Sequence, residues 1–270
     1  MSVNITGLYS YPIKSCGALS HEEIAVTELG LEHDRQWMLV DDNGLFISQR
    51  KHPKMALIQP HITDQQLMVE APGMSTMEIS NVSGQAVDVQ VWKDQLTAAQ
   101  SPEHINQWFS DYLHTSVRLV RHASHSRRLV DTEFAKSGEQ VAFADGYPIL
   151  ITHQASLDAL NARLSTPVSM NRFRPNVVVK TEQAAWAELD WQHMTHQHGA
   201  LDLVKPCTRC VMTGVDQRLG TQTGSEVLKT LRTEFAHQDQ AVFGINVIPR
   251  IHRGGMRLQR GDSLQLQQPE

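Results

Sequence analysis

The residues best suited to chemistry are two cysteines three positions apart, Cys207 and Cys210, in the stretch KPCTRC. Such a pair can form a disulfide, carry out thiol redox exchange, supply half of a zinc site, or offer one thiolate to a softer metal. A thioredoxin-like redox motif requires a helix that begins at the pair. The next residues read VMTGVD, which is β-branched and interrupted by glycine, so we expect no helix there. The redox interpretation is therefore disfavoured.

A zinc site at this pair would need further ligands, because structural zinc is usually held by four. Cys16 and the histidines of WQHMTHQHG, namely His193, His196 and His198, could supply them. No second pair has the spacing of a zinc finger, however, and clustered histidines are more often solvated loop residues. A cysteine without a close partner in the sequence, such as Cys16, is more often a small buried hydrophobe. Zinc is the weakest of the alternatives.

The cysteine content predicts a reducing, cytoplasmic compartment. The chain has 3 cysteines, and its N-terminus lacks the apolar run of a secretory signal, so a disulfide is disfavoured. Two interpretations of the pair remain open. One is a single thiolate that binds a soft metal, because Lys205 and Arg209 favour the charged form of a nearby thiol. The other is two half-buried cysteines at the end of a strand.

Several basic residues lie in turn-like settings. Lys14 and Ser15 follow YPI, Arg35 precedes a predicted strand in GLEHDRQW, and Arg172 and Arg174 precede another in NRFRPN. Arginine offers a planar fork of donors and lysine a point charge, and both suit phosphate. Together these residues would form an anion clamp, although their spacing does not show that they converge.

The remaining features of the sequence exclude several classes of partner. It contains no P-loop, no dinucleotide-binding glycine fingerprint and no nucleophile elbow. The formal net charge of −5 argues against a nucleic acid or an anionic membrane surface as partner. No stretch approaches the roughly 20 apolar residues that a membrane span needs. With 40% hydrophobic residues, the chain has globular composition.

Residues 1–100 are expected to form short strands joined by turns. The stretch ITGLYSYPI alternates, and RQWMLVDDNGLFISQR places two apolar runs around Asn43-Gly44, which predicts a hairpin. A further turn is expected at 81–84. The first helix is expected at Ser101-Pro102-Glu103, with Ser101 as the N-cap candidate and proline at the first helical position. Apolar residues then recur at helical spacing: Ile105, Trp108, Phe109, Tyr112 and Leu113.

The second half of the chain repeats this mixture. Strands are expected in GYPILIT, NVVVK, LDLVKPC, AVFGINVIPRI and SLQLQ, and helices in HQASLDALNARL and SEVLKTLRTEF. The segment RHASHSRRLVDTEFAKSGEQ between the halves is polar and irregular, which is typical of a loop or link. Many short strands with a few helices predict a β-rich α+β fold. We place the boundary between two domains, 1–120 and 121–270, in the region of residues 115–135.

Six motifs in series resemble the MOSC superfamily over nearly the whole chain. They are YPIKSCGA, LEHDRQWMLVD, FADGYPILITHQASLDALN, RFRPNVVV, KPCTRCVMTGVD and FGIN. The chain resembles most closely the branch with an N-terminal MOSC β-barrel domain. That branch includes the mitochondrial amidoxime-reducing component and bacterial proteins that detoxify N-hydroxylated bases. The resemblance implies an N-terminal β-barrel-like domain packed on a C-terminal MOSC β-barrel with peripheral helices.

The resemblance also implies a molybdenum cofactor, in which a molybdopterin holds the metal and a protein cysteine is a further ligand. That cysteine corresponds to the second of the pair, Cys210, which makes it the metal ligand and the catalytic residue. Cys207 is then a loop residue that shapes the site. Positions that would contact the cofactor are Lys14, Ser15, Arg35, Asp145, Tyr147, Arg174, Thr208, Arg209 and Asn246.

The activity implied by the resemblance is reduction of a small N-hydroxylated substrate from N–OH to N–H. The bacterial relatives often carry a C-terminal ferredoxin-like domain with a four-cysteine iron–sulfur site, whereas no cysteine follows Cys210 here. We therefore expect electrons from a separate donor protein, or from a ferredoxin-like domain missing from this sequence. The alternative is a non-redox MOSC module that carries sulfur or the cofactor through Cys210.

Overall fold

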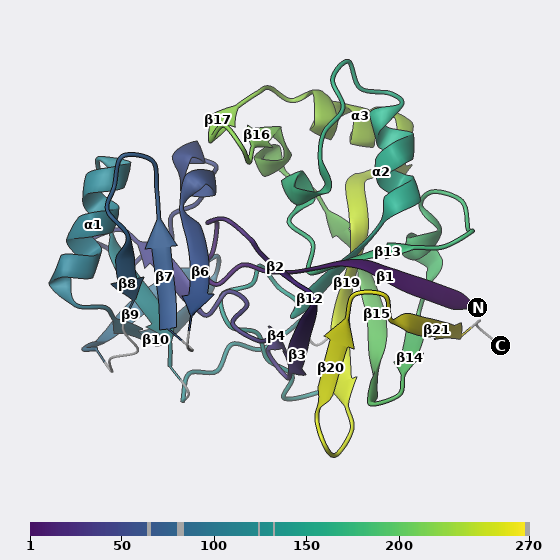
Figure 1. The fold of residues 1–270 in the computed structure, drawn as a ribbon, viewed down its shortest axis with the longest axis horizontal. Helices are drawn as coiled ribbons and strands as arrows, with labels where there is room; N and C mark the ends of the chain where they lie inside the picture. Colours follow the sequence, from purple (N-terminus) through teal and green to yellow (C-terminus); the bar gives the residue numbers. More distant parts are fainter. Residues whose placement is uncertain (64–65, 80–83, 124, 132, 268–270) are drawn as a thin grey trace.

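The protein was analysed as a computed structural model, which describes residues 1–63, 66–79, 84–123, 125–131 and 133–267. Figure 1 shows two strand-rich lobes, with the first strand and the C-terminal half of the chain in the larger one. The β-rich α+β prediction is confirmed, because most of the regular structure is strand and only three α-helices are formed by the described residues. None of these helices is both long and apolar enough to span a bilayer.

The larger lobe contains a closed barrel. Each strand pairs with the next, and the last one pairs with the first. In spatial order the strands are β12 (Ile149–His153), β13 (Val177–Lys180), β1 (Ser2–Ser10), β21 (Ser263–Gln267), β14 (His193–His196), β15 (Gly199–Thr208) and β19 (Gln240–Ile251). Short strands extend it at its edges: β2 (Leu19–His21) and β18 (Ala236–His237).

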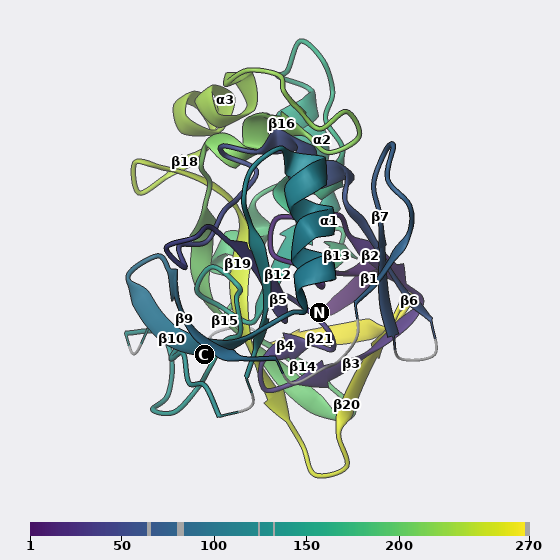
Figure 2. The ribbon, with the colours of Figure 1, turned by 90° about the vertical axis from the view of Figure 1, so that its left-hand side faces the viewer.

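The smaller lobe is built from two sheets and one helix. The first sheet consists of β5 (Trp37–Val40), β11 (Arg118–His122), β10 (Asp94–Gln100) and β9 (Ala86–Val91). The second consists of β6 (Gln59–Thr63), β7 (Gln66–Glu70) and β8 (Met77–Ile79). Helix α1 (Glu103–Leu113) covers the outer side of this lobe and faces the viewer in Figure 2.

The strand pairing crosses the boundary that the sequence suggested near residue 120. Strand β1 is a member of the closed barrel, and β3 (Glu23–Thr27) pairs with β4 (Gly30–Leu31) and with the distant β20 (Met256–Gln259). The domain limits 1–120 and 121–270 remain a prediction. The pairing shows that the first 31 residues are shared between the barrel and the connection to the smaller lobe.

The remaining elements lie outside the barrel and outside the two sheets of the smaller lobe. They are the helices α2 (Gln154–Asn161) and α3 (Glu226–Glu234), the pair β16 (Val215–Asp216) and β17 (Thr221–Gln222), and the 3₁₀ helices η1 (Pro53–Leu57), η2 (Met170–Phe173), η3 (Ala187–Asp190) and η4 (Val211–Gly214).

Several local predictions are confirmed and three need correction. Gly44 adopts φ 78° in a turn between Val40 and Phe46, as the hairpin signal indicated. Helix α1 begins at Glu103, so Pro102 and not Ser101 is its N-cap residue. The histidines His193 and His196 belong to strand β14 and not to a loop, because their strand neighbours pair with β15 and β21. Most of the turn expected at 81–84 lies outside the described residues.

The third correction concerns the residues after the cysteine pair, where no helix was expected. A four-residue 3₁₀ helix, η4, begins directly after Cys210, and Cys210 is its N-cap residue. Thr213 closes this turn, since both its backbone N and its hydroxyl donate to the carbonyl oxygen of Cys210. A 3₁₀ turn needs only one or two local hydrogen bonds, so β-branched residues and a glycine are compatible with it.

Apolar residues of helices α2 and α3 anchor these helices to the barrel. Leu157, Leu160, Val227 and Leu231 are buried against a cluster that includes Phe173 and Phe243. The last two aromatic rings stack with centroids 3.8 Å apart. The backbone oxygen of Phe173 also accepts a hydrogen bond from Arg209 in the cysteine loop, so packing in this cluster positions that loop.

We expect Phe243→Ala to destabilise the protein by about 3–5 kcal/mol, because it removes a fully buried ring and leaves a cavity. Urea unfolding at neutral pH measures this change in the free energy of unfolding. Leu219→Ala is the matched control, since Leu219 is 54% exposed and its truncation should cost no more than about 0.5 kcal/mol. Equal losses in both variants would contradict this account of the core.

Candidate functional site

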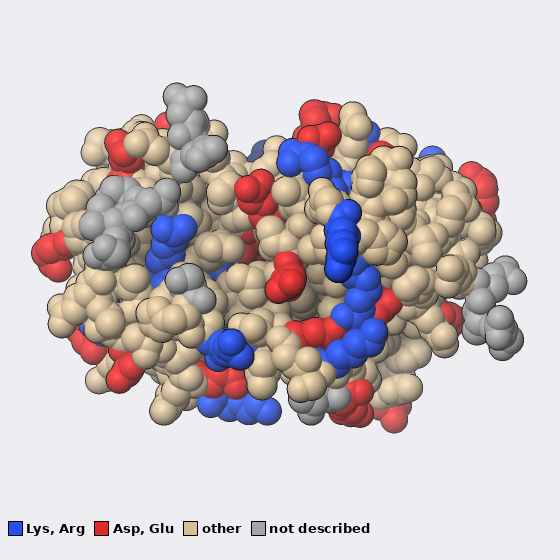
Figure 3. All heavy atoms as spheres, turned by 90° about the horizontal axis from the view of Figure 1, so that it is seen from below, with Lys and Arg blue, Asp and Glu red and all other residues tan. Residues whose placement is uncertain are grey.

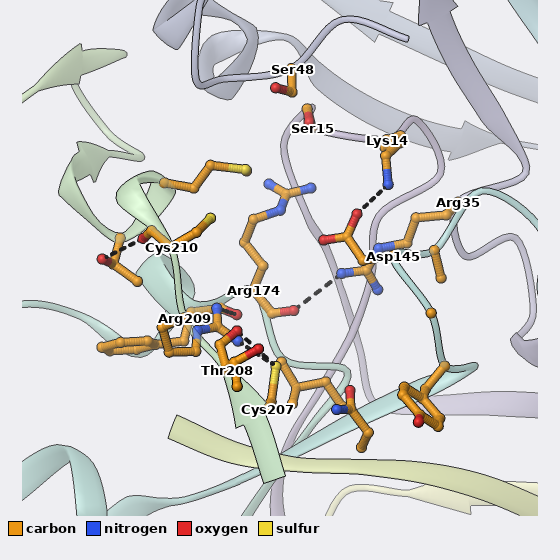
Figure 4. Close-up of a pocket in the computed structure, with 18 of the residues that line it drawn as sticks. Lys14, Ser15, Arg35, Ser48, Asp145, Arg174, Cys207, Thr208, Arg209 and Cys210 are labelled. Carbon is orange, nitrogen blue, oxygen red and sulfur yellow. Dashed lines mark hydrogen bonds and ion pairs between the residues drawn. The ribbon is translucent and has the colours of Figure 1, made fainter. Parts of the chain in front are cut away.

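A cavity of about 300 Å³ lies where the loops of both lobes meet the end of strand β15. Figure 4 shows side chains from distant parts of the sequence pointing toward one another in it. The structure brings together every site residue predicted from the sequence. Those that line the cavity are Lys14, Ser15, Arg35, Asp145, Tyr147, Arg174, Thr208, Arg209, Cys210 and Asn246. Their contacts with a cofactor remain a prediction.

Three of these lining residues have a strained backbone. Ser15, Arg35 and Arg174 adopt positive φ angles of 67°, 47° and 55°. This left-handed region is uncommon for residues other than glycine and costs of order 1–3 kcal/mol for each residue held there. Such strain gathers at functional sites, where the surrounding structure imposes it. Its concentration around one cavity therefore supports this region as the functional site.

Tyr11 lies beside two of the arginines, Arg35 and Arg174, and its role was not predicted from the sequence. The guanidinium groups of Arg35 and Arg174 lie 4.3 Å and 4.2 Å from the centre of its ring. Its hydroxyl donates to the backbone oxygen of Pro175. A ring face attracts cations, so this buried tyrosine holds two like charges near each other without a bridging carboxylate between them.

The guanidinium groups of Arg35 and Arg174 differ in how far a nearby carboxylate compensates their charge. Burial alone would lower the pKa of Arg35, but the adjacent Asp34 carboxylate, 2.7 Å away, raises it above its usual value. Burial lowers the pKa of Arg174 to about 10. Its Nη1 donates to the carbonyl oxygen of Cys16 at 2.6 Å, whereas its buried Nη2 has no partner in the part of the chain that the structure describes. Arg174 therefore has an unused donor and an uncompensated charge.

Lys14 forms an ion pair across the cavity mouth. Its buried Nζ lies 2.5 Å from Oδ1 of Asp145 and donates to the backbone oxygen of Phe143 at 2.8 Å. Burial lowers the pKa of Lys14. Burial would raise the pKa of Asp145, but the Lys14 ammonium lowers it strongly. The pair connects a loop after β1 to the FADGYP loop of the second half.

The cysteine pair is asymmetric in the structure. The thiol of Cys207 accepts a hydrogen bond from Nη1 of Arg209, two positions later in the chain, at 3.0 Å. Cys207 lies near the end of strand β15 and is not the loop residue that was predicted, because its segment pairs with β19. The thiol of Cys210 instead accepts from Nη2 of Arg50, which belongs to the smaller lobe, at 3.4 Å. Both cysteines are free and half-buried. A donor from another lobe fixes Cys210 within the shared cavity, whereas Cys207 is held by its own neighbours.

Several lining residues were not predicted from the sequence. Arg50 and Ser48 follow the predicted hairpin in FISQR, and Met212 follows Cys210. The basic residue near the end of FISQR was a usable signal, but 160 positions separate Arg50 from Cys210. Arg172, proposed for the anion clamp, lines the cavity while it also bonds Thr223 and Asp216.

The donor set fits an anionic group that carries a soft metal. Arginine and phosphate or carboxylate groups pair through charge-assisted hydrogen bonds, and thiolates select soft metals. Three buried donors of the site, Nη2 of Arg174, Nε of Arg209 and the hydroxyl of Tyr147, lack partners among the described residues. A single carboxylate, Asp145, accompanies the cations of the wall, which are Lys14, Arg35, Arg50, Arg172, Arg174, Lys205 and Arg209.

The structure also bears on the zinc interpretation. Among the residues that the structure describes, no group of three or more His, Cys, Asp or Glu could hold a metal ion, so the zinc alternative lacks its ligands. On the face seen in Figure 3, acidic side chains interrupt the basic ones. The absence of a nucleic-acid partner remains a prediction from the net charge.

Burial of acidic groups beside the cavity predicts alkaline sensitivity. Burial raises the pKa of the Cys16 thiol from 9.0 to about 12 and that of the Tyr11 phenol from 10.0 to about 12. As the pH rises above 9.0, the unfolded chain loses these protons before the folded protein does. The free energy of unfolding should therefore fall between pH 9 and 12, by about 1.4 kcal/mol per pH unit for each group.

Urea unfolding between pH 8 and 11 measures this dependence. In Cys16→Ala the fall in stability between pH 9 and 10 should become smaller by about 1 kcal/mol, because the unfolded chain loses the Cys16 proton in this range and Tyr11 contributes mainly above pH 10. The test compares the pH dependence of the free energy of unfolding and not its absolute value, because truncation at Cys16 also changes the stability at neutral pH. An unchanged slope in this variant would contradict the prediction.

Comparison with known proteins agrees with the arrangement of the chain. Residues 2–116 match the model of the MOSC N-terminal beta barrel domain, and residues 138–265 match that of the MOSC domain. The chain is 31% identical to mitochondrial amidoxime-reducing component 1 of Xenopus laevis, over 88% of this chain and 73% of that protein. It is also 31% identical to mitochondrial amidoxime reducing component 2 of Bos taurus, over 85% of this chain and 71% of that protein.

A second group of relatives carries a different name. Molybdenum cofactor sulfurase 1 of Aedes aegypti is 29% identical over 83% of this chain, which covers 31% of that longer protein. Both groups are named for molybdenum-cofactor or amidoxime chemistry. The two domain models together account for both lobes and for the cysteine loop. The chain therefore belongs to the MOSC family, in the form that carries both the N-terminal beta barrel domain and the MOSC domain.

Proposed function

We propose that the protein is a molybdenum-cofactor-dependent reductase of small N-hydroxylated compounds, which it converts from N–OH to N–H. The observation that carries the proposal is the free Cys210 thiol at a cavity rich in cations, in a chain 31% identical to amidoxime-reducing components. The net reaction consumes two electrons and two protons and releases water. We further propose that the electrons come from a separate donor protein, or from a ferredoxin-like domain on a longer form of the chain.

In this proposal the cofactor supplies the two-electron chemistry at its metal when bound. Cys210 is the metal ligand, and Arg50 orients its thiol. Arg174 and Arg35 hold the anionic part of the cofactor, with the unpartnered Nη2 of Arg174 as one donor. The buried Lys14 supports the same charge from the side of Asp145. Other wall residues would complete the contacts: Ser15, Tyr147, Thr208, Arg209 and Asn246.

Metal analysis of protein from a cofactor-competent host tests the proposal. We expect about one molybdenum atom per chain, and turnover of benzamidoxime to benzamidine with a chemical reductant in place of the natural donor. Protein that is folded but free of molybdenum would contradict the proposal. The three free thiols agree with a reducing, cytoplasmic compartment, which we propose on that basis.

The sulfurase relatives favour one alternative, a non-redox module that carries sulfur on Cys210 or carries the cofactor. A persulfide would form when a cysteine desulfurase transfers its sulfane sulfur to the Cys210 thiol. Incubation with such an enzyme and cysteine would then add about 32 Da at Cys210, as expected for one sulfur atom. This adduct, together with no turnover of amidoximes by molybdenum-loaded protein, would favour the carrier over the reductase.

A further inference from the structure

A second cavity, of about 990 Å³, opens beside the first and shares part of its wall. The residues common to both are Phe46, Asp145, Gly146, Tyr147 and Lys205. Ligand sites commonly combine an apolar wall with a few placed polar groups, and a molecule in the second cavity would lie directly beside the first. All predicted cofactor residues line the first cavity, and of them only Asp145 and Tyr147 also line the second, whose other wall residues have no assigned role.

The wall of the second cavity exposes large apolar side chains to solvent. Leu45, Trp92 and Leu129 have exposed fractions of 40%, 40% and 57%. Exposed apolar groups of this size that gather around one hollow mark a binding site more often than a bare surface. Of the five tryptophans in the chain, all of which are described, only Trp92 is classed as exposed.

Trp92 is held in its position by contacts and at a cost in backbone strain. Its φ angle is 56°, which is an outlier for so large a residue. The Phe46 ring lies 4.9 Å from its ring, and the Arg50 guanidinium lies 4.5 Å from the ring centre. Its Nε1 donates to Oδ1 of Asp145 at 3.2 Å. A strained residue that several neighbours hold in place is preorganised for a function.

These contacts place Trp92 close to the reactive thiol. Arg50 contacts the Trp92 ring and donates to Sγ of Cys210, so one side chain separates the indole from the proposed metal ligand. A substrate that stacked on Trp92 would therefore have its reacting end near the first cavity. Arg50, a residue of the smaller lobe, thus lies between Trp92 and the Cys210 thiol.

Asp145 offers a polar group at the shared wall. Its side chain is 69% exposed, and its Oδ1 already accepts from Lys14 and Trp92. The second carboxylate oxygen points away from Lys14 in Figure 4. The Lys14 ammonium holds the pKa of this carboxyl well below its usual range, so the carboxylate is charged near neutral pH. It can accept hydrogen bonds from N–H groups of a bound molecule.

We propose that Trp92 and Asp145 form a substrate subsite for a planar, conjugated nitrogen compound. The ring of this compound stacks on the indole, and its N–H groups donate to Oδ2 of Asp145. Aromatic substrates are thereby favoured over aliphatic ones that carry the same N-hydroxylated group. This inference rests on the proposed function for the identity of the reacting group, but the subsite itself is defined by Trp92, Asp145 and the second cavity.

Binding of two product-like amidines tests the subsite without any turnover. Benzamidine and acetamidine carry the same N–H groups and differ in the ring, and calorimetry on molybdenum-loaded protein gives both dissociation constants. In Trp92→Ala the dissociation constant of benzamidine should rise about tenfold, as expected for a lost stacking contact. That of acetamidine should change less than about twofold, and Trp92→Phe should retain most of the benzamidine affinity.

Two further variants distinguish loss of the subsite from a general loss of amidine binding. Asp145→Asn should weaken both amidines by about tenfold, because each loses a charge-assisted hydrogen bond. Leu219→Ala should change neither, since Leu219 is similarly exposed but lies outside both cavities. In the unaltered protein, benzamidine should also protect the exposed Trp92 from fluorescence quenching by acrylamide, which tests the contact without a substitution.

The proposal is overturned if Trp92→Ala weakens both amidines equally, if it changes neither, or if benzamidine leaves quenching unaffected. Its failure is distinct from that of the proposed function. Selective, Trp92-dependent binding of benzamidine to a protein that does not reduce benzamidoxime would support the subsite and contradict the reductase. Molybdenum-dependent reduction of aryl and alkyl amidoximes with equal preference would support the reductase and contradict the subsite.

Discussion

Cys210→Ser is expected to lower the rate of amidoxime turnover by at least about 1,000-fold and the molybdenum content of the purified protein severalfold. A serine hydroxyl is a hard, weakly acidic group, whereas the proposed soft metal selects a thiolate. Loss of a metal ligand removes the chemistry itself, so its effect exceeds that of lost binding contacts, which are worth about 10- to 100-fold each. Elemental analysis and turnover with a chemical reductant measure the two effects.

Cys207→Ser is the matched control, because it makes the same atomic change three positions away, near the end of strand β15. The Cys207 thiol accepts a hydrogen bond from its near neighbour Arg209. A serine oxygen accepts the same bond, so we expect molybdenum content near that of the unaltered protein and activity within about tenfold. Equal losses in the two variants, or full activity in Cys210→Ser, would show that the two cysteines do not divide their roles in this way.

Arg174→Gln is expected to lower the affinity for the cofactor by about 10- to 100-fold. The variant loses a charged donor, and a hydrogen bond to a charged group contributes about 1.5–3 kcal/mol. Nη2 of Arg174 has no partner among the described residues, and burial already lowers the pKa of Arg174 to about 10, so an anion would stabilise it more than a compensated arginine. The measurement is cofactor retained per chain after extended dialysis, from the fluorescence of the released, oxidised pterin.

Arg172→Gln is the control for this variant. Arg172 is as buried as Arg174 and lines the same cavity, but its guanidinium already bonds Thr223 and Asp216. We expect it to lower the free energy of unfolding with a smaller loss of cofactor. Arg174→Lys should recover part of the affinity, since it keeps the charge and loses the planar fork. Equal cofactor loss in Arg172→Gln and Arg174→Gln would contradict the role of the unpartnered donor.

Much of the fold was predictable, because its signals are local. Periodic apolar residues identified α1, α2 and α3, and β-branched runs identified β13 and most of β19. The errors are also local in origin. Propensity argued against a helix after Cys210, yet a 3₁₀ turn needs only the Thr213 bonds to form. His193 and His196 looked like loop residues because pairing with β15 and β21, and not their own propensity, makes them a strand.

The motifs determined which residues gather at the site, since the series from YPIKSCGA to KPCTRC identified the family and with it all ten predicted positions. They did not reveal Tyr11 between two guanidinium groups, the bond from Arg50 to Cys210, or the strained Trp92 beside Asp145. Each of these depends on closing the barrel through β1 and folding the smaller lobe against its rim. Side chains 160 positions apart meet only after those long loops close, and no local pattern encodes such a contact. The sequence alone thus predicted Cys210 as the metal ligand, and the tertiary structure decided what surrounds its thiol.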